Sequence, residues 1–411
     1  MSPKRILVLG GGFAGLWSAV GAARKLDELG QGPDAVEVTL VNRDAFHSIR
    51  VRNYEPDLTP VRVPLDDVLS PVGVRRVEGE VADIDPTGQA VTVTTSCGQQ
   101  DLFYDRLVFA LGSQLLRPPI AGLGEHAFDV DTYNSAAKLN NHLQSLPSRP
   151  ESPGQFTVIV VGAGLTGIET ATELPGRLRA VLARARSPRP FRVILADHNP
   201  VVGSDMGESA RPVIEEALVA LGVETRLGIE VVSINPMGIT LKSGEEMPAA
   251  TVVWCAGMRA NPLTRVFPVE PDRFGRIPVD EFMRIKGVAN VFAAGDVACA
   301  LMDDDRHASV MSCQHGRPMG RFAGHNVVCD LLGLPLLPLR IDWYVTVLDL
   351  GSWGAVYTEG WDRHVVTKGE TAKKTKQVIN GQRIYPPLTR NRMEILAAAA
   401  PVVQRPPEVF H

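Results

Sequence analysis

Two stretches of the chain share one pattern of hydrophobic and polar positions: an apolar run, a glycine cluster and a mostly apolar segment of helical period. They read RILVLGGGFAGLWSAVGAARKL at 5–26 and FTVIVVGAGLTGIETATEL at 156–174. A continuous apolar run that ends at glycines is typical of a parallel strand buried on both faces. Each stretch therefore predicts a strand, a tight turn and a helix. A second apolar strand follows each one, at 36–41 and at 191–197.

Both predicted turns carry the G-x-G-x-x-G spacing. It is formed by Gly10, Gly12 and Gly15 in the first turn and by Gly162, Gly164 and Gly167 in the second. In a dinucleotide-binding fold the first glycine permits the turn, the second lets a pyrophosphate approach, and the third lets helix and strand pack closely. The amides at the helix N-terminus then face the phosphates. Two such turns in one chain predict two dinucleotides that are used together.

The residues that end the two following strands differ in charge. Asn42 ends the first strand, where it can hydrogen-bond a ribose without adding charge. Asp197 ends the second, where a carboxylate accepts hydrogen bonds from a ribose 2′-hydroxyl and repels a 2′-phosphate. His198 and Asn199 follow it instead of an arginine. The second site is therefore predicted to prefer NADH to NADPH.

Composition narrows the class of protein. A chain of 411 residues is long enough for two or three domains, and 45% hydrophobic with 21% charged residues is typical of globular proteins. The net charge of −4 gives no global basicity, so no nucleic-acid partner is expected. The five cysteines show neither CxxC nor metal-ligand spacing, which argues for a cytoplasmic location without a disulfide framework or a metal site. We expect no signal peptide and no bilayer-spanning run of ~18 apolar residues.

Three further segments place the glycine turns in a known order. They are YDRLVFALGS at 104–113, WCAG at 254–257 and NVFAAGDVA at 290–298. The order of these motifs resembles that of the two-dinucleotide-binding-domain flavoproteins, the pyridine nucleotide-disulfide oxidoreductase-like superfamily. The resemblance implies an enzyme with FAD in the first site and NAD(P)H in the second. It also implies that Asp296 binds the ribityl chain of the flavin and that the backbone near Val81 meets the adenine.

Within that superfamily the chain most resembles the type II NADH dehydrogenases, which are NADH:quinone oxidoreductases. It lacks a cysteine before Cys97 and any CxxC, features that the disulfide-reducing branches need. It also lacks a cysteine between Cys97 and Cys255, which the sulfide:quinone branch would use. The segments that resemble the type II enzymes are VVGAGLTGIETATEL, VRVPL at 61–65, TVVWCAGMRANP at 251–262 and LDLGSWGAV at 348–356.

The resemblance implies an α/β fold with two Rossmann-like dinucleotide-binding domains and a C-terminal α+β segment. We expect an FAD-binding domain split between 1–118 and 262–330, an inserted NAD(H)-binding domain at 119–261, and an acceptor-side segment at 331–411. NADH is expected to reduce FAD, which passes electrons to a quinone or quinone-like acceptor. One alternative is a soluble NAD(P)H-dependent flavin reductase or oxidase that acts on a small aromatic metabolite or an electron-transfer protein. Another is a non-catalytic redox sensor, and a homodimer is left open.

The resemblance also assigns residues to the two cofactors. FAD contacts are expected from Gly10, Gly12, Phe13, Ala14, Gly15, Asn42, Arg43, Val81, Ala110, Gly112, Asp296 and Val297. NAD contacts are expected from Gly162, Gly164, Thr166, Gly167, Asp197 and Gly257. Glu169 is expected as a catalytic residue where nicotinamide meets flavin, to hold the carboxamide or relay a proton. The alternative is a helix-start carboxylate stabilised by the helix dipole.

The segment MSCQHGRPMG at 311–320 groups a thiol, an amide and an imidazole. The type II enzymes have A-Q and a second Gln in a helix here, and these positions fall on Cys313-Gln314 and Pro318. The helix is expected to begin near or after Pro318. Its first amides, with Gln314 as a catalytic side chain, are expected to face the flavin edge that becomes negative on reduction. Cys313 is expected to pack, because it and His315 are two residues apart and do not face each other on a helix. His315 is expected at the surface or as a cap.

One departure from the type II pattern is FHSIRVRNYE at 46–55, which replaces an apolar stretch. Its candidate acceptor-pocket residues are His47, Arg50, Arg52 and Tyr54. They predict either solvated charges or a polar pocket for an anionic or oxygen-rich substrate.

The second departure is the tail, 361–411, which carries nine Lys and Arg against four Asp and Glu. It lacks the wide apolar stripe with aromatics that binds a membrane interface. Its Lys373, Lys374 and Lys376 could reach anionic lipid headgroups. With Pro318 in place of the second Gln, a membrane contact is expected to be at most peripheral, on the inner face.

Overall fold

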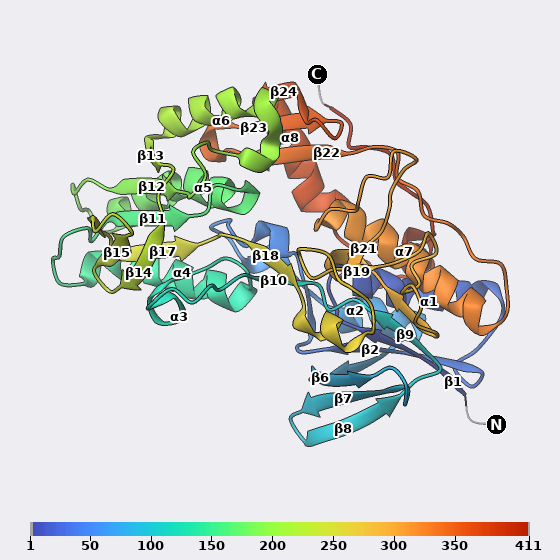
Figure 1. The fold of residues 1–411 in the computed structure, drawn as a ribbon. Helices are drawn as coiled ribbons and strands as arrows, with labels where there is room; N and C mark the ends of the chain where they lie inside the picture. The colour runs from blue at the N-terminus through green and yellow to red at the C-terminus, as the bar shows by residue number, and fades with distance from the viewer. Residues whose placement is uncertain (1–2, 410–411) are drawn as a thin grey trace.

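The computed structural model describes residues 3–409 as two parallel sheets with helices against them and an antiparallel sheet near the C-terminus (Figure 1). The strands of the parallel sheets are continuous apolar runs, so both faces of each sheet must be covered. The predicted fold class, two Rossmann-like domains with a C-terminal α+β segment, is confirmed.

The first sheet has the order β20-β9-β1-β2-β5, and all neighbouring strands are parallel. Its strands are β1 (Lys4–Leu9), β2 (Val36–Asn42), β5 (Arg75–Glu78), β9 (Arg106–Phe109) and β20 (Val291–Ala293). Smaller sheets of this half pair β3 (Phe46–Ser48) with β4 (Arg62–Pro64), β6 (Glu80–Asp85) with β7 (Ala90–Thr95) and β8 (Gly98–Phe103), and β19 (Ile277–Pro278) with β21 (Ala298–Cys299). Strand β20 lies beside β9 in this sheet, although the strands of the second sheet come between them in the sequence.

The second sheet has the order β13-β12-β11-β17 and is also parallel. Its strands are β11 (Thr157–Val161), β12 (Arg192–Ala196), β13 (Val223–Arg226) and β17 (Thr251–Trp254). The helices of this half are α3 (Leu123–His126), α4 (Tyr133–Ser145), α5 (Leu165–Arg184) and α6 (Gly207–Leu221). An antiparallel sheet beside it contains β14 (Val231–Asn235), β15 (Gly238–Leu241) and β16 (Glu246–Pro248).

A two-stranded ribbon and the C-terminal segment join the two halves. In the ribbon, β10 (Ser113–Leu115) runs antiparallel to β18 (Met258–Ala260), next to the predicted domain boundaries at 118 and 261. The C-terminal sheet contains β22 (Val345–Asp349), β23 (Ala355–Glu359) and β24 (His364–Gly369) and carries α8 (Glu370–Val378). It packs against α5 and α6 of the second domain. None of the helices described between residues 3 and 409 has the length and apolarity needed to cross a bilayer.

Helix α7 (Cys313–Leu331) lies directly against α1 (Phe13–Glu28), as Figure 1 shows, and α2 (Leu65–Leu69) and α9 (Arg392–Ala398) lie in the same half. A Cβ at Gly320 would lie 2.3 Å from the Ala14 carbonyl oxygen, so the two helix backbones touch. The prediction that α7 begins near or after Pro318 is wrong. The helix begins at Cys313, where the Ser312 hydroxyl accepts a hydrogen bond from the His315 amide, and Pro318 lies inside it. The cap and the close packing on α1 compensate for the bond that proline cannot donate.

Candidate functional site

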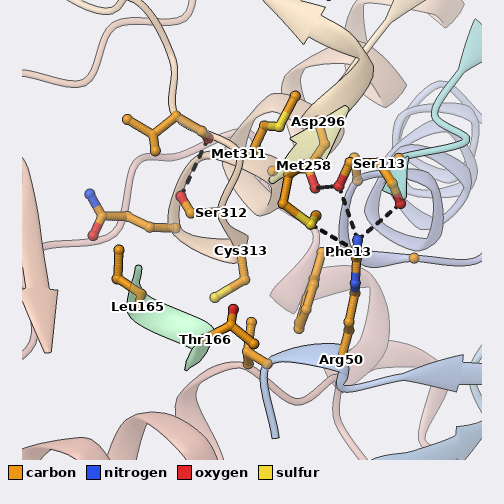
Figure 2. Close-up of a pocket in the computed structure, with 18 of the residues that line it drawn as sticks. Phe13, Arg50, Ser113, Leu165, Thr166, Met258, Asp296, Met311, Ser312 and Cys313 are labelled. Atoms are coloured by element: carbon orange, nitrogen blue, oxygen red, sulfur yellow. Dashed lines mark hydrogen bonds between the residues drawn. The ribbon is translucent and has the colours of Figure 1, made fainter. Parts of the chain in front are cut away.

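A single cavity of about 1160 Å³ reaches from the first glycine turn to the second. It passes between the two domains and is closed on another side by the C-terminal segment, through Trp343 and Lys376 among others. Figure 2 shows how Phe13 of α1, Cys313 of α7 and Thr166 of α5 gather around one space. The two predicted cofactor sites are therefore parts of one continuous volume.

The three glycines of the first turn have different surroundings. Gly10 has φ +101°, and a Cβ there would lie 2.5 Å from the Ala110 carbonyl oxygen. A Cβ at Gly15 would lie 1.8 Å from the Gly10 carbonyl oxygen. A Cβ at Gly12, in contrast, would meet no atom of the described chain within 4 Å. The protein itself needs the first and third glycines, whereas the second keeps the cavity side of the turn bare.

The second turn repeats this arrangement. Gly162 has φ +111°, and a Cβ there would lie 2.8 Å from the Ala256 amide nitrogen. A Cβ at Gly167 would lie 1.7 Å from the Gly162 carbonyl oxygen, but one at Gly164 would meet only Asp205 Oδ2, at 3.7 Å. A bare backbone at the N-terminus of a helix fits a diphosphate. Both turns therefore fit the pyrophosphate of a dinucleotide.

Most of the other residues assigned to the cofactors also line the cavity. On the first side these are Gly10, Gly12, Phe13, Ala14, Asn42, Arg43, Val81, Ala110, Gly112 and Asp296, and on the second Gly162, Gly164, Thr166, Asp197 and Gly257. Gly15, Val297 and Gly167 lie behind this wall. Burial raises the pKa of the Asp296 carboxyl, and the hydrogen bond that Ser113 Oγ donates at 2.6 Å opposes this (Figure 2).

The side chains that end the two central strands support the glycine turns. Asn42 Oδ1 accepts a hydrogen bond of 2.8 Å from the Gly11 amide. Asp197 Oδ2 accepts one of 2.5 Å from the Ala163 amide, and Oδ1 accepts one of 2.7 Å from the Asn199 amide. Each residue thus shapes the turn as well as facing the cavity, a role that the sequence did not reveal.

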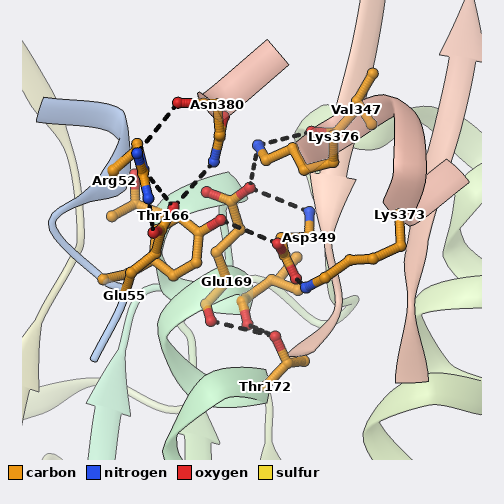
Figure 3. A network of polar contacts seen from close by, with 12 residues as sticks. Arg52, Glu55, Thr166, Glu169, Thr172, Val347, Asp349, Lys373, Lys376 and Asn380 are labelled. Carbon is orange, nitrogen blue, oxygen red and sulfur yellow. Dashed lines mark hydrogen bonds and ion pairs between the residues drawn. The ribbon is translucent and has the colours of Figure 1, made fainter. Parts of the chain in front are cut away.

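Glu169 lies at the centre of a buried polar network that links α5 to the C-terminal segment (Figure 3). Lys376 Nζ of α8 lies 2.7 Å from Glu169 Oε1 and donates to the Val347 carbonyl at 2.9 Å. The Asp349 amide also donates to Glu169 Oε1, at 3.1 Å, and Asp349 Oδ2 accepts from the Tyr54 hydroxyl at 3.2 Å. Sequence reasoning missed Lys376 and Asp349 as partners of Glu169, because they follow it by about two hundred residues and carry no local motif.

The same network involves the lysines of the tail that could reach lipid headgroups. Lys376 is buried against Glu169, and Lys373 Nζ lies 2.6 Å from Asp349 Oδ1. Lys374 is exposed, at 3.8 Å from Glu370. Two of the three lysines thus neutralise carboxylates inside the molecule and are not available to a membrane surface.

The charges of this network affect one another. Burial raises the pKa of the Glu169 carboxyl, Lys376 opposes the rise, and Asp349 adds to it. Burial disfavours the charge on Lys376, but Glu169 and Asp349 outweigh it and raise the pKa of the ammonium. Lys376 therefore stays charged at neutral pH, and Glu169 can exchange a proton more readily than an exposed carboxyl.

The segment at 46–55 is not a set of solvated charges, so that interpretation is wrong. His47 is fully buried, its Nδ1–H donates to the Gly11 carbonyl at 2.8 Å, and burial lowers its pKa to about 4. Arg50 is paired with Asp131 and donates to the Ser113 carbonyl at 3.0 Å. Arg52 is paired with Glu55, 2.6 Å away. Of the four candidates Arg50 and Tyr54 line the cavity, whereas His47 and Arg52 lie behind it.

At the start of α7, Cys313 and Gln314 line the cavity but His315 does not, so no nucleophile pair faces it. Burial raises the pKa of the Cys313 thiol, which keeps it protonated. His315 is buried, not at the surface, and its Nδ1 accepts a hydrogen bond of 2.8 Å from the Val310 amide, so it braces the loop before the helix. Gln314 Nε2 is buried, lines the cavity, and has no acceptor among residues 3–409. Nor does that range contain a cluster of three side chains able to hold a metal ion.

Comparison with known proteins gives the family. The model of the family described as "Pyridine nucleotide-disulphide oxidoreductase" matches residues 4–320. A NADH dehydrogenase-like protein of Mycobacterium tuberculosis is 60% identical over 403 residues, which cover 98% of this chain and all of the relative. A type II NADH:quinone oxidoreductase of Staphylococcus saprophyticus is 28% identical over 407 residues, covering 93% and 95% of the two chains.

Solved structures share the fold at low sequence identity. NDH2 of Plasmodium falciparum, solved in complex with NADH, superposes with a TM-score of 0.75 at 12% identity, covering 96% of this chain and 97% of that one. The free cysteines of the described chain are Cys97, Cys255, Cys299, Cys313 and Cys329, and none of them is paired. The family and the enzyme class that the motifs predicted are confirmed: the chain belongs to the pyridine nucleotide-disulphide oxidoreductase family and is an NAD(P)H oxidoreductase similar to NADH dehydrogenases.

Proposed function

We propose that the protein transfers a hydride from NADH to bound FAD and passes the electrons to a quinone or a quinone-like acceptor. The observation that carries this proposal is one continuous cavity that reaches both glycine turns. In each turn the second glycine leaves the backbone uncovered on the cavity side. A hydride moves only between atoms in contact, so two dinucleotides must extend from their own turns and meet in a shared volume. The relatives named for NADH dehydrogenase and NADH:quinone oxidoreductase activity support the choice of donor and acceptor.

FAD would be held by the turn at Gly12, the support from Asn42 and the carboxylate of Asp296. When bound, it supplies the centre that takes up a hydride and releases electrons to an acceptor. The protein's contribution is electrostatic. The N-terminus of α7 and the unpaired amide donor of Gln314 both face the cavity, where they stabilise negative charge that forms on reduction.

Glu169 and Lys376 are suited to hold and transfer a proton beside the reacting centres. Both line the cavity, and the 2.7 Å contact between them lets a proton or a charge be shared. Quinone reduction consumes protons, so a buried carboxyl with a raised pKa next to a fixed ammonium is suited to supply them. Tyr54 extends this network through Asp349.

Asp197 is expected to set the preference for NADH. Its carboxylate lines the cavity at the second turn, where it would repel a 2′-phosphate. Asp197→Asn keeps the side-chain oxygen that accepts from the Ala163 amide but removes the charge. The ratio of kcat/KM for NADH over NADPH should fall about tenfold, which corresponds to ~1.4 kcal/mol. An unchanged ratio in steady-state assays would refute this role.

Cys313 is not expected to take part in the chemistry. Its thiol is protonated, and the residue packs against the apolar cluster that contains Ile49 and Ile384. Cys313→Ala should therefore reduce its flavin with NADH at the wild-type rate, within a factor of about two. Complete loss of reduction in a stopped-flow experiment would show that the thiol is a reactant.

Double-mixing stopped-flow tests the whole cycle. The anaerobic protein is first mixed with one equivalent of NADH and then with a quinone, and the visible flavin absorption is followed. We expect the absorption to disappear in the first step and return in the second. Bleaching that no quinone reverses would exclude the proposed acceptor class while leaving the NADH half-reaction intact.

A further inference from the structure

Two arginines of α7 face the cavity without a counter-charge. Arg317 and Arg321 are one helical turn apart and only 6% and 2% exposed, yet both line the cavity. No carboxylate within residues 3–409 lies within 4.0 Å of either guanidinium, and neither Nε atom has a hydrogen-bond acceptor in that part of the chain. Arg50 and Arg52, by comparison, are each paired with an acid.

Trp17, Arg383 and the Cys313 thiol lie near these arginines, and none of the three carries a carboxylate. The guanidinium carbons of Arg317 and Arg321 lie 5.7 and 4.5 Å from the ring centre of Trp17. Arg383 of the C-terminal segment also lines the cavity and adds to the positive potential, since it disfavours the charge on both. Burial lowers the pKa of Arg317 to about 10 and that of Arg321, helped by Arg317, to about 9. Both groups remain cationic at neutral pH.

Two buried arginines without a carboxylate partner destabilise the folded protein when no ligand is bound. A buried ion needs a paired charge to offset its lost hydration, and one stacking contact on an aromatic ring offsets only part of this. Arginine also offers a planar fork of donors that matches carboxylate, sulfonate and phosphate oxygens. The arginine pair therefore has the properties of an anion-binding site that opens into the cavity.

The aromatic ring that both arginines approach lies beyond the first glycine turn along α1. Trp17 is five residues beyond Gly12, about 7.5 Å further along α1. Arg383 donates a hydrogen bond to the carbonyl of Arg405, and residues 403, 404 and 407 of this C-terminal stretch also line the cavity. The arginines thus lie beside Trp17 of α1 and near Arg383 of the C-terminal segment, and Gly316 and Gly320 of the same helix lie against the start of α1.

We propose that Arg317 and Arg321, with Arg383 beside them, bind an anionic substituent of the electron acceptor, such as a carboxylate, sulfonate or phosphate. This inference rests on the proposed function and specifies its acceptor: a small quinone-like or aromatic molecule with a negative group. The ring of the acceptor would then extend from the arginines toward Phe13 and Cys313.

A pair of matched acceptors tests the specificity. Naphthoquinone and a naphthoquinone sulfonate differ by one negative group, and the ratio of their kcat/KM values is measured in the wild type, Arg317→Met, Arg321→Met and the double variant. Methionine keeps an apolar stem and removes the charge. We expect the preference for the sulfonate to fall at least tenfold in the double variant and to be partly retained in Arg321→Lys, which keeps the positive charge. Arg265→Met, which removes an exposed arginine outside the cavity, should leave the ratio unchanged.

Binding measured without turnover separates this inference from the proposed function. In equilibrium dialysis with the oxidised holoenzyme, the sulfonate should bind the wild type at least tenfold more tightly than the double variant, while naphthoquinone binds both alike. If no quinone turns over but this binding difference holds, the acceptor class is wrong and the anion site stands. Equal losses for both quinones would overturn the anion site.

Cofactor content and thermal stability exclude two other roles for the arginines. The double variant should keep its full FAD content, and loss of FAD would assign the arginines to the diphosphate of the flavin instead. Without acceptor, its melting temperature should equal or exceed that of the wild type, because an uncompensated buried charge has been removed. A lower melting temperature together with an unchanged acceptor ratio would show a purely structural role on Trp17 and overturn the proposal.

Discussion

Gly164→Ala is expected to yield a folded, yellow protein that NADH can hardly reduce, whereas Gly12→Ala is expected to yield a folded protein that has lost its FAD. Both glycines have ordinary φ angles, −80° and −74°, so alanine adds no backbone strain. Both also have room for a methyl group, which would meet Asp205 at 3.7 Å in one case and no described atom within 4 Å in the other. The methyl therefore obstructs only a ligand that must touch the turn.

The size of the effect follows from the loss of close contact. A methyl that keeps a diphosphate from the helix amides should weaken binding by roughly 3 kcal/mol or more, about a hundredfold. Flavin absorbance per protein measures the first site, and the concentration of NADH that gives half-maximal reduction rate measures the second. Gly176→Ala, which adds a methyl to open space on α5 away from the cavity, is the matched control and should change neither value. If both cavity variants kept wild-type FAD content and NADH affinity, the turns would not be dinucleotide sites.

Lys376→Met is expected to lower the free energy of unfolding by about 3–5 kcal/mol at neutral pH, because it leaves Glu169 buried beside Asp349 without its cation. Methionine fills a similar volume, so the loss reflects charge and not a cavity. Lys374→Met removes an exposed lysine of the same helix and should cost less than about 0.5 kcal/mol. Lys376→Met combined with Glu169→Gln should recover most of the stability, since the carboxylate is then gone. Urea unfolding of the four proteins gives these values.

The pH dependence of Lys376→Met has a definite sign. Burial and Asp349 raise the pKa of Glu169, and removing Lys376 removes the main opposing influence, so the pKa rises further. The folded variant then binds a proton more tightly than the unfolded chain, and its stability falls as pH rises through that pKa. The variant should be close to wild type below the ordinary carboxyl pKa and least stable above the raised one. The Glu169 ionisation in the pH profile of quinone reduction should likewise move to higher pH. A stability difference independent of pH would contradict the buried ion pair.

The sequence revealed those parts of the site whose causes are local. The glycines at 10, 12 and 15 define a turn within six residues, and their spacing indicated the turn and the helix that follows it. The apolar runs likewise predicted the parallel strands on each side of them. Pro318 misled for the same reason: its local preference indicated a helix start, but the Ser312 cap and the packing of Gly320 on Ala14 let the helix begin earlier.

The charged side chains could not be assigned in this way. Lys373 and Lys376 look like solvated tail residues, and only the fold brings them to Asp349 and Glu169. The charges of the 46–55 segment could be solvated or line a pocket, and Asp131, the acid that pairs with Arg50, lies far along the chain. Arg317 is the opposite case, because its lack of a partner becomes visible only when its neighbours are known. Pairing of charges depends on tertiary contacts that a linear pattern does not encode.

An anaerobic titration of the purified protein with NADH tests the central claim most directly. If the two turns hold FAD and NADH in one cavity, the protein will be yellow, and one equivalent of NADH per flavin will remove its visible absorption. A colourless protein with both glycine turns intact, or a yellow one whose absorption excess NADH leaves unchanged, would contradict the account.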